Sequence, residues 1–419
     1  MGKFYKRPKR QCPEVNLHPI SIKCLREGHP WITQDKFSDK FPKEPLFLTA
    51  LDANQKPLGQ LLNDPDHSKI KARIWNKEGA QSLNLSIFTR QLRERLATAL
   101  RARTKLASSG ERQNFYLVFG EADQLPGLFI LKLKDHLVVQ YYSKVWDRLE
   151  EVLKSELGKA LLENFPEWKA LDIWRHDRVS STDHELKRLN LPGIENQKNL
   201  TSFELSEFGI NYRIHLGKYY DYGIYTDMAA IRKKLMPLFK TSKSLLNLYS
   251  YTGAFSLLGL KSGHHNVTSI DLSPPYMQWL EENIKLNPEL NSEHHHSMVM
   301  PVHQGLEQLV SKGIKFDLIV SDPPSASCDK KKISSAYDNY KKDLPLLLKL
   351  LNPGGTLVAF LNTQGISWKK YAQGMDEVLK LNKNLVQAPK VTRLNLDEDC
   401  TRLGTFPEGD YLKGLVIKI

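Results

Sequence analysis

The 419-residue sequence has few cysteines and no long hydrophobic segment. No apolar run approaches the roughly 18–20 residues of a membrane-spanning helix, so we expect no transmembrane segment. The opening residues, MGKFYKRPKRQCPEV, are basic but no apolar stretch follows them, which argues against a secretory signal. Cys12, Cys24, Cys328 and Cys400 are scattered and form no Cys-x-x-Cys pair. We therefore expect neither a disulfide scaffold nor a zinc ribbon, and the chain fits the reducing cytoplasm.

Glycine-rich nucleotide-binding motifs are also missing. Neither Gly-x-Gly-x-x-Gly nor Gly-x-x-x-x-Gly-Lys-Ser/Thr occurs, so a P-loop enzyme is not expected and a nicotinamide dehydrogenase is poorly supported. Two histidine runs, at residues 264–265 and 294–296, raise the question of a metal site. Adjacent histidines point in different directions, and no cysteine or acidic residue stands at ligand spacing. We therefore expect an exposed loop and no metal.

The composition is that of a globular protein with an uneven charge distribution. Hydrophobic residues make up 41% and charged residues 26% of the sequence, enough apolar material for the packed cores of two or three domains. Of the net charge of +13, most lies in residues 1–110, which hold 21 basic and 10 acidic residues; the other 309 residues hold 39 and 37. A localised basic field is typical of nucleic-acid binding. A solubilising surface would explain the same charge equally well.

Residues 13–80 contain short strand-like runs separated by turns. The segment 44–62 has two apolar runs around an Asn-Gln-Lys-Pro turn, which predicts a β-hairpin. The segment 69–75, KIKARIW, alternates basic and apolar residues, which predicts a half-buried strand. The cations that we expect on its outer face are Lys69, Lys71 and Arg73. An ordinary solvated face explains the alternation but not why all three outer residues are basic.

The middle of the chain predicts a mixed α and β domain. Residues 86–105 form an amphipathic basic pattern with Leu92, Leu96 and Leu100 near one stripe, which predicts a helix. Its arginines could contact phosphates, although simple exposure also explains them. Three strand-like runs with two turns follow in residues 114–142, and residues 145–165 have a helical pattern.

From about residue 243 the pattern alternates between strands and helices, which predicts a parallel sheet covered by helices on both faces. Ligands bind such sheets at the carboxyl ends of the strands. Three features fall there: the loop 249–255 with its single Gly253, then Asp271 at the end of the next strand, and Asp322-Pro323-Pro324-Ser325 after the fourth strand.

These features indicate the kind of ligand. Gly253 would let the backbone approach a ligand closely, but one glycine does not build a pyrophosphate cradle. The carboxylate of Asp271 suits the two hydroxyls of a ribose. A ligand with adenine and ribose but no phosphate, S-adenosylmethionine, fits best. The simpler alternatives are a helix cap for Asp271, a role that Ser273 could also serve, and a plain turn for residues 322–325.

Together these segments resemble the class I S-adenosylmethionine-dependent methyltransferases of bacterial large-subunit ribosomal RNA, nearly from end to end. The matching segments are LREGHPWI (25–32) and KIKARIW (69–75) for an N-terminal PUA-type domain, FGEADQLPGL (119–128) for a central domain, LLNLYSYTGAF (245–255) for the cofactor loop, FDLIVSDPPS (316–325) for the catalytic loop and TFPEGDYLKG (405–414) for the C-terminal strand. YYDYGIYTDMAAIR (219–232) resembles the segment that closes over the cofactor.

The resemblance implies an α/β fold with three parts. Residues 1–82 would be a small β-rich PUA-like RNA-binding domain, residues 83–200 a central α+β domain, and residues 201–419 a Rossmann-like class I methyltransferase domain. It further implies S-adenosylmethionine as cofactor, RNA (above all large-subunit ribosomal RNA) as partner, and a cytoplasmic location with neither membrane nor metal. The oligomeric state stays open, with a homodimer as one option.

The resemblance also implies site residues. For the cofactor they are Tyr225, Asp227, Tyr249, Ser250, Tyr251, Thr252, Gly253, Ala254, Phe255, Asp271, Leu272 and Gln304. For catalysis they are Asp322, Pro323, Pro324, Ser325 and Asn362. For RNA they are His29, Trp31, Lys69, Lys71 and Arg73.

Departures from the family pattern bear on the target atom. Cytosine-C5 enzymes carry a cysteine at the end of strand five, because a thiolate must first activate the ring; here Asn362 stands there. Cys328, six residues past Asp322, is more simply a loop thiol. Amino-group methylation goes with an aromatic residue after the two prolines, where this chain has Ser325. The DxSxxYxxW run from Asp271 to Trp279 resembles a guanine-N7 branch, whose target needs no covalent activation. The domain order and the C-terminus resemble the cytosine-C5 branch instead, so a guanine nitrogen is at least as well supported as cytosine C5, and both targets stay open.

Two further departures concern the cofactor. Met228 follows Asp227 where relatives have Arg or His, which leaves Arg232 as the nearby cation. His303-Gln304-Gly305 replaces an acidic residue near the adenine, and we expect Gln304 to hydrogen-bond adenine N6. We therefore expect an RNA base methyltransferase, and the alternative is a non-catalytic RNA-binding or ribosome-assembly protein with the same fold.

Overall fold

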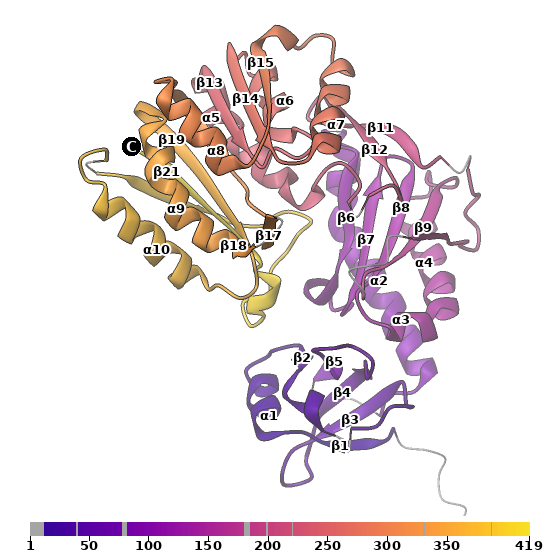
Figure 1. The fold of residues 1–419 in the computed structure, drawn as a ribbon. Helices are drawn as coiled ribbons and strands as arrows, with labels where there is room; N and C mark the ends of the chain where they lie inside the picture. The colour runs from indigo at the N-terminus through magenta and orange to yellow at the C-terminus, as the bar shows by residue number, and fades with distance from the viewer. Residues whose placement is uncertain are drawn as a thin grey trace, which may run out of the picture. The chain divides into compact units, whose positions relative to one another are not determined.

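The computed structural model describes residues 12–38, 41–77, 82–179, 185–197, 200–219, 221–324, 326–329, 332–386 and 388–419 (Figure 1). The chain forms two compact units. The first comprises Met1–Gly110, Tyr116–Leu200 and Leu403–Phe406, and the second comprises Glu111–Phe115, Thr201–Arg402 and Pro407–Ile419. The expected domain boundaries at residues 82 and 200 stay a prediction.

The N-terminal sheet of the first unit has the strand order β1-β3-β4-β5-β2. Its strands are β1 (Glu14–Asn16), β2 (Trp31–Ile32), β3 (Phe47–Leu51), β4 (Pro57–Asn63) and β5 (Ala72–Lys77), with helix α1 (Pro19–Arg26) and the 3-10 turn η1 (Gln34–Phe37) beside them. The expected hairpin is confirmed, because β3 and β4 pair antiparallel. Asp52 Oδ1 stabilises the turn by accepting the amides of Asn54 and Lys56, at 2.8 and 3.0 Å.

The expectation that Arg73 faces outward is wrong. Strand β5 begins at Ala72, and Arg73 is 2% exposed. Its guanidinium lies 3.2 Å from Asp64 Oδ2 and 2.7 Å from Glu121 Oε1, and it donates to the carbonyl of Tyr142 at 2.9 Å. These acceptors compensate the loss of hydration that burial imposes on a charge. Arg73 is therefore an internal ion-pair residue and not the outward-facing cation that the alternation predicted.

The second sheet has the strand order β10-β9-β8-β7-β6. Its elements are β6 (Asn114–Phe119), η2 (Gly120–Asp123), β7 (Leu128–Leu133), β8 (His136–Tyr141), β9 (Asp172–Asp177) and β10 (Leu186–Arg188), with helices α2 (Leu85–Ser109), α3 (Val145–Arg148) and α4 (Glu150–Asn164). The predicted helix is α2. The Asn84 side chain caps its start by accepting from the amide of Ile87 at 3.0 Å, and Gly110 ends it with a φ of 66°.

The second unit begins with the hairpin β11 (Ser202–Glu207) and β12 (Ile210–His215). Its seven-stranded sheet has the order β15-β14-β13-β16-β19-β21-β20. The strands are β13 (Ser244–Leu248), β14 (Asn266–Asp271), β15 (His295–Val299), β16 (Phe316–Ser321), β19 (Leu351–Asn362), β20 (Lys390–Leu394) and β21 (Leu412–Lys418). The helices are α5 (Ala229–Thr241), α6 (Ala254–Lys261), α7 (Pro274–Lys285), α8 (Val302–Ser311), α9 (Ala336–Lys349) and α10 (Trp368–Leu381).

The shorter elements of the second unit are η3 (Thr226–Met228), η4 (Ser292–His294), η5 (Pro407–Gly409) and the pair β17 (Ala326–Asp329) and β18 (Lys332–Ser335).

The predicted α/β sheet is confirmed. Strands β13 to β16 and β19 pair in parallel, and β21 pairs antiparallel with β19. Helices α5, α6 and α7 cover one face and α8, α9 and α10 the other (Figure 1), as right-handed crossovers require. The strand order reverses between β13 and β16. This reversal opens a crevice at the carboxyl ends of those two strands.

The expected exposed loop at the histidine run is wrong. His295 and His296 lie in the edge strand β15, which pairs with β14. The Nε2 atom of His295 lies 2.7 Å from Ser269 Oγ, and burial, with a smaller contribution from His296, lowers the pKa of His295 to about 4. Within the described ranges, no group of three or more His, Cys, Asp or Glu residues is placed to hold a metal ion. The edge pairing explains the run without a ligand.

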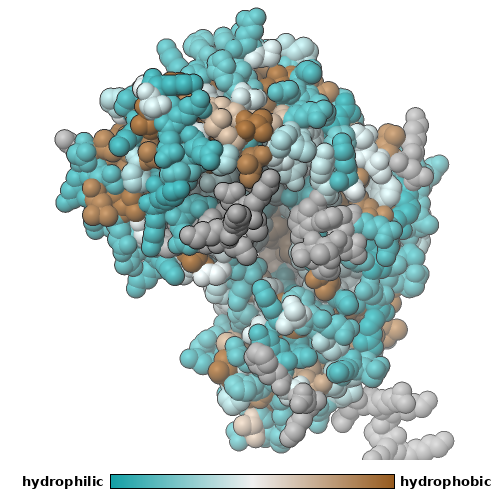
Figure 2. Space-filling model, viewed as in Figure 1, coloured by the Kyte–Doolittle hydropathy of each residue, from teal (hydrophilic) through white to brown (hydrophobic). Residues whose placement is uncertain are grey.

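The surface in view is mostly hydrophilic, with hydrophobic residues scattered over it (Figure 2). No helix in the described part of the chain is long and apolar enough to cross a membrane. Scattered exposed apolar side chains are ordinary. Tyr225 and Leu272, 42% and 55% exposed, are different because both line the same cavity.

Candidate active site

A cavity of about 950 Å³ lies in the second unit, at the carboxyl ends of β13, β14, β16 and β19. The strand order places it where ligands bind open α/β sheets. Its lining residues are Ile224, Tyr225, Asp227, Met228, Arg232, Asn247, Tyr249, Ser250, Tyr251, Thr252, Ala254, Phe255, Asp271, Leu272, Ser273, Tyr276, Pro301, Val302, His303, Asp322, Pro323, Pro324, Asp338, Asn339, Lys342, Asp343, Asn362 and Leu412. Most of the predicted cofactor and catalytic residues therefore line this one cavity.

The loop between β13 and α6 has a strained backbone. Tyr249 and Tyr251 have φ values of 55° and 50°, in the left-handed region that few non-glycine residues adopt. Gly253 has a φ of 87°, and a Cβ there would lie 2.4 Å from Leu280 Cγ. Only glycine fits this position without a shift of its neighbours. Gly253 thus packs against Leu280 and does not line the cavity, whereas the adjacent Thr252 and Ala254 do.

Asp271 holds this loop in place. One carboxylate oxygen accepts from the amide of Tyr251 and the other from the amide of Ser273, both at 2.9 Å. Asp271 therefore does cap the start of the following helix. This does not exclude that it also binds a ligand, because a carboxylate can accept about four hydrogen bonds. Burial raises the pKa of Asp271, while the backbone hydrogen bonds act in the opposite direction. The carboxylate therefore keeps acceptor capacity on the cavity side for a ligand.

The segment before α5 folds against the same loop. Thr252 Oγ1 donates to the carbonyl of Gly223 at 2.5 Å, and the Gly223 amide donates to Tyr251 Oη at 3.1 Å. A Cβ on Gly223 would lie 2.3 Å from the Trp279 ring, so this close approach requires glycine. The rings of Tyr225 and Tyr251 lie 5.1 Å apart. The segment that contains Tyr225 and Asp227 is thus part of the cavity wall, as the resemblance implied.

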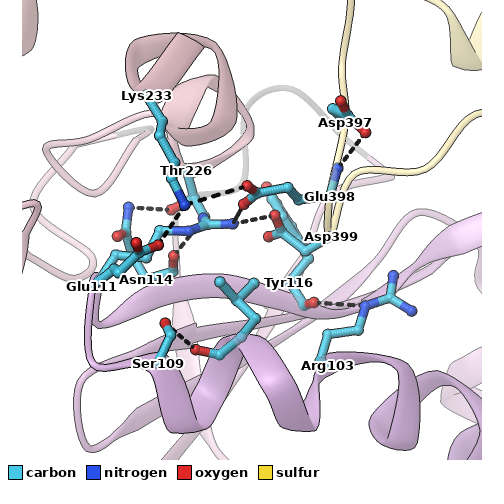
Figure 3. Close-up of polar contacts among 12 residues, drawn as sticks. Arg103, Ser109, Glu111, Asn114, Tyr116, Thr226, Lys233, Asp397, Glu398 and Asp399 are labelled. Carbon is cyan, nitrogen blue, oxygen red and sulfur yellow. Dashed lines mark hydrogen bonds and ion pairs between the residues drawn. The ribbon is translucent and has the colours of Figure 1, made fainter. Parts of the chain in front are cut away.

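Arg232 fixes that segment from inside. It is 2% exposed, and its Nε and Nη2 atoms donate to the two oxygens of Glu207 at 2.6 and 2.8 Å. Nη2 also donates to the carbonyl of Tyr225 at 2.9 Å. Asn114 Nδ2 donates to Glu207 Oε2 at 2.8 Å. It also lies 3.4 Å from Thr226 Oγ1 (Figure 3). Arg232 therefore anchors the segment directly, through Glu207 and the carbonyl of Tyr225.

A second charged cluster supports the same region. Arg112 Nη2 lies 2.5 Å from Asp399 Oδ1 and 3.1 Å from Glu398 Oε2. Lys233 Nζ lies 2.5 Å from Glu111 Oε2 and 4.0 Å from Glu398 Oε1 (Figure 3). These contacts join residues 111–114, the start of α5 and residues 397–399. Sequence reasoning missed them, because no local pattern indicates which distant charges will meet.

The predicted catalytic loop, residues 322–325, begins where β16 ends. Tyr340 Oη lies 2.8 Å from the carbonyls of both Ser321 and Phe360, and Tyr371 Oη donates to the carbonyl of Ala359 at 3.0 Å. Two buried phenols thus fix the ends of β16 and β19 beside the cavity. Asp322, Pro323 and Pro324 line it, as does Asn362 from the end of β19. The predicted residue Ser325 lies outside the described residues, as does the side chain of Cys328.

The carboxyl of Asp322 is not an ordinary surface acid. Burial, and then the charge of Asp227, raise its pKa to about 7, while Arg232 acts in the opposite direction. Aspartate ordinarily titrates near 4. A cationic ligand in the cavity would favour the ionised form.

The charge of the lining shows which cofactor fits. Among its described residues, five are aspartates against one arginine and one lysine; the aspartates are Asp227, Asp271, Asp322, Asp338 and Asp343. An acidic cavity attracts cations and repels phosphates. S-adenosylmethionine has a sulfonium and an ammonium against one carboxylate, so its charge matches this lining better than that of a dinucleotide does.

The prediction for Gln304 is not supported. Gln304 is exposed on α8 and is not among the residues that line the cavity. His303 lines it instead, and its Nδ1 lies 2.6 Å from Oδ1 of Asp343, which comes from α9. Asp343 therefore places a carboxylate beside His303, although the segment His303-Gln304-Gly305 itself has no acidic residue. Its separation of 40 residues from His303 hides it from motif reading.

The remaining predicted RNA residues lie in the first unit. Trp31 and His29 are half-buried, and the Trp31 ring centre lies 4.6 Å from that of Phe406. Trp31 Nε1 donates to Glu121 Oε1 at 2.7 Å. Lys69 is exposed and Lys71 is half-buried. Of this set, Lys69 is the most open to a phosphate.

Comparison with known proteins identifies the family. Residues 170–387 match the profile of the S-adenosylmethionine-dependent methyltransferases. A ribosomal RNA large subunit methyltransferase I of Pseudoalteromonas translucida is 30% identical over 412 residues, 97% of this chain and 99% of that protein. The protein of the same name from Vibrio cholerae is 28% identical over 418 residues, with the same coverage of both chains.

Solved structures agree in fold. A Streptococcus mutans protein, proposed to be an S-adenosylmethionine-dependent methyltransferase, superimposes with a TM-score of 0.81 at 19% identity, over 97% of this chain and 100% of that one. A proposed methyltransferase solved with S-adenosylhomocysteine gives 0.83 at 19% identity, with the same coverage. The chain belongs to the S-adenosylmethionine-dependent methyltransferase family, and S-adenosylmethionine is its cofactor.

Proposed function

We propose that the protein methylates a base of large-subunit ribosomal RNA. The relatives that match nearly its whole length are named for that activity. The basic excess of residues 1–110 suits an RNA partner. The observation that carries the proposal is the acidic cavity, which has the adenosine-side residue Asp271 and the catalytic-loop residue Asp322 in one wall.

Each part of the wall has a role in the proposal. When bound, S-adenosylmethionine supplies an electrophilic methyl group. Asp271 would accept hydrogen bonds from the ribose hydroxyls, and the loop 249–255 with Leu272 would enclose the adenosine. Tyr225 and Asp227 close over the cationic end. The target base, extruded from the RNA, lies against Asp322, Pro323 and Pro324, with Asn362 as a second polar contact.

The cavity also favours one kind of target atom. A thiolate route to cytosine C5 needs a cysteine, and the described lining residues include none. Asn362 lines the cavity at the position where the sequence resemblance implies the cysteine of cytosine-C5 enzymes. We therefore infer that the acceptor is a base nitrogen with an in-plane lone pair, such as guanine N7. Such an atom needs orientation and no covalent activation. Asp322 and Asn362 would provide the orientation.

Methyl transfer from tritiated S-adenosylmethionine to ribosomal RNA of a strain without this gene tests the proposal, followed by mass spectrometry of the digested nucleosides. We expect labelled 7-methylguanosine. Asp322→Ala should abolish incorporation, whereas Asp376→Asn, which breaks only an exposed pair with Lys380, should not. Labelled 5-methylcytidine, or a covalent complex with RNA containing 5-fluorocytidine, would refute the inferred target. Absence of any RNA labelling would refute the function.

A further inference from the structure

We propose that Tyr411 is a positioning residue of the cofactor site, which keeps Asp227 in place and in its ionised form. Tyr411 Oη donates to Asp227 Oδ2 at 2.6 Å. Asp227 lies in η3, in the cavity wall, and Tyr411 comes immediately before β21, 184 residues later. The inference rests on the proposed place of Asp227 beside the cationic end of the cofactor.

Tyr411 is itself held firmly. The buried Lys413 donates from Nζ to the carbonyls of Thr363, Asp410 and Tyr411, at 2.8, 3.1 and 3.2 Å. The amide of Thr363 donates to the Tyr411 carbonyl at 3.0 Å, and Trp368 Nε1 donates to Asp410 Oδ2 at 2.8 Å. The phenol therefore reaches Asp227 from a fixed backbone. The same lysine fixes the chain directly after Asn362, so this segment supports two parts of the cavity wall.

The surroundings of Asp227 make its charge dependent on this bond. Burial raises the pKa of Asp227; the Tyr411 hydrogen bond and then Arg232 lower it, and Asp399 raises it. A hydrogen bond to an ionised carboxylate is stronger than one to a neutral group. Removal of the phenol should therefore raise the pKa of Asp227.

Asp322 should respond in the opposite direction. The charge of Asp227 contributes to its high pKa, so a more easily protonated Asp227 lowers the pKa of Asp322. The other charged or titratable groups that interact with Asp322 are Arg232, Tyr225, Tyr340 and Tyr371. Opposite shifts at two carboxyls are a signature that general loosening of the fold would not produce.

The test is calorimetric binding of S-adenosylhomocysteine to the full-length Tyr411→Phe variant between about pH 5 and pH 8. Affinity requires ionised Asp227, so it is present above the pKa of Asp227 and is lost as the pH falls through it. In the variant this loss should begin at a higher pH, and affinity in the acid range should fall about tenfold. The assay needs no RNA, so its outcome is independent of the proposed substrate.

Two further variants keep the test decisive. Trp368→Phe loosens the same segment but leaves the phenol in place, so it should lower the melting temperature without moving the acid midpoint. In an Asp227→Asn background, Tyr411→Phe should have little additional effect, because the two residues act through one contact. An unchanged midpoint in Tyr411→Phe, an equal shift in Trp368→Phe, or additive losses in the double variant would overturn the inference.

Discussion

Replacement of Glu207 by glutamine should strongly lower the stability of the second unit, which contains the cavity. Glu207 and Arg232 are 1% and 2% exposed, and Glu207 receives three hydrogen bonds, two from Arg232 and one from Asn114. Glutamine keeps one acceptor oxygen and turns an NH₂ group toward existing donors. The buried Arg232 charge then lacks its partner, which typically costs about 3–5 kcal/mol.

The loss should be visible in thermal unfolding. At about 2–4 °C per kcal/mol for a unit of this size, we expect the melting temperature to fall by about 6–20 °C. Differential scanning calorimetry measures the shift. The matched control is Asp397→Asn, which removes the exposed pair with Lys234 and should have an effect of at most about 1 kcal/mol. If Glu207→Gln unfolds within about 2 °C of this control, the buried pair is not what holds the cofactor-closing segment.

Three other predictions test separate parts of the structure. We further propose that Asp343, which lines the cavity beside His303, accepts a hydrogen bond from the adenine amino group. Asp343→Asn should then weaken S-adenosylhomocysteine binding several-fold but leave S-inosylhomocysteine binding nearly unchanged, because that analogue lacks this amino group. Equal losses in calorimetry would contradict the contact to adenine. The pKa of Asp322 is about 7, and a bound cation lowers it, so S-adenosylmethionine binding near pH 7 should release up to about half a proton. Calorimetry in two buffers of different ionisation enthalpy measures this release. If the Asp322→Asn variant releases the same amount, Asp322 is not the source. Arg73→Met should destabilise the first unit by about 3 kcal/mol, because it leaves the carboxylates of Asp64 and Glu121 without their cationic partner. Lys69→Ala should instead weaken salt-dependent RNA binding without changing the melting temperature. If Arg73→Met weakens RNA binding and leaves the melting temperature unchanged, Arg73 is an RNA contact after all.

Local sequence patterns were sufficient where one segment sets its own structure. Apolar runs and turn residues predicted the alternating strands and helices of the sheet. They placed Gly253, Asp271 and Asp322 at strand ends, and parallel pairing then brings these ends to one edge. The cavity was predictable for this reason, because its position follows from strand direction and order.

Local patterns failed where a side chain's surroundings come from elsewhere in the chain. The alternation in residues 69–75 could not reveal that Asp64 and Glu121 bury Arg73. The sequence around His295 and His296 has no alternation of apolar and polar residues that would predict a strand. These residues form an edge strand because they pair with β14. Gln304 stood at the motif position predicted to contact adenine, yet α8 presents His303 to the cavity instead, where it contacts Asp343.

The sequence by itself therefore determined the fold class, the position of the cofactor site and the family resemblance, because hydrophobic periodicity and glycine and proline placement act over a few residues. Only the tertiary structure decided which charges are paired inside and which partners hold the cavity wall. Arg232 with Glu207 and Tyr411 with Asp227 join segments 25 and 184 residues apart. Such contacts depend on how whole elements pack, since a buried charge or phenol is stabilised by whichever group the fold brings to it.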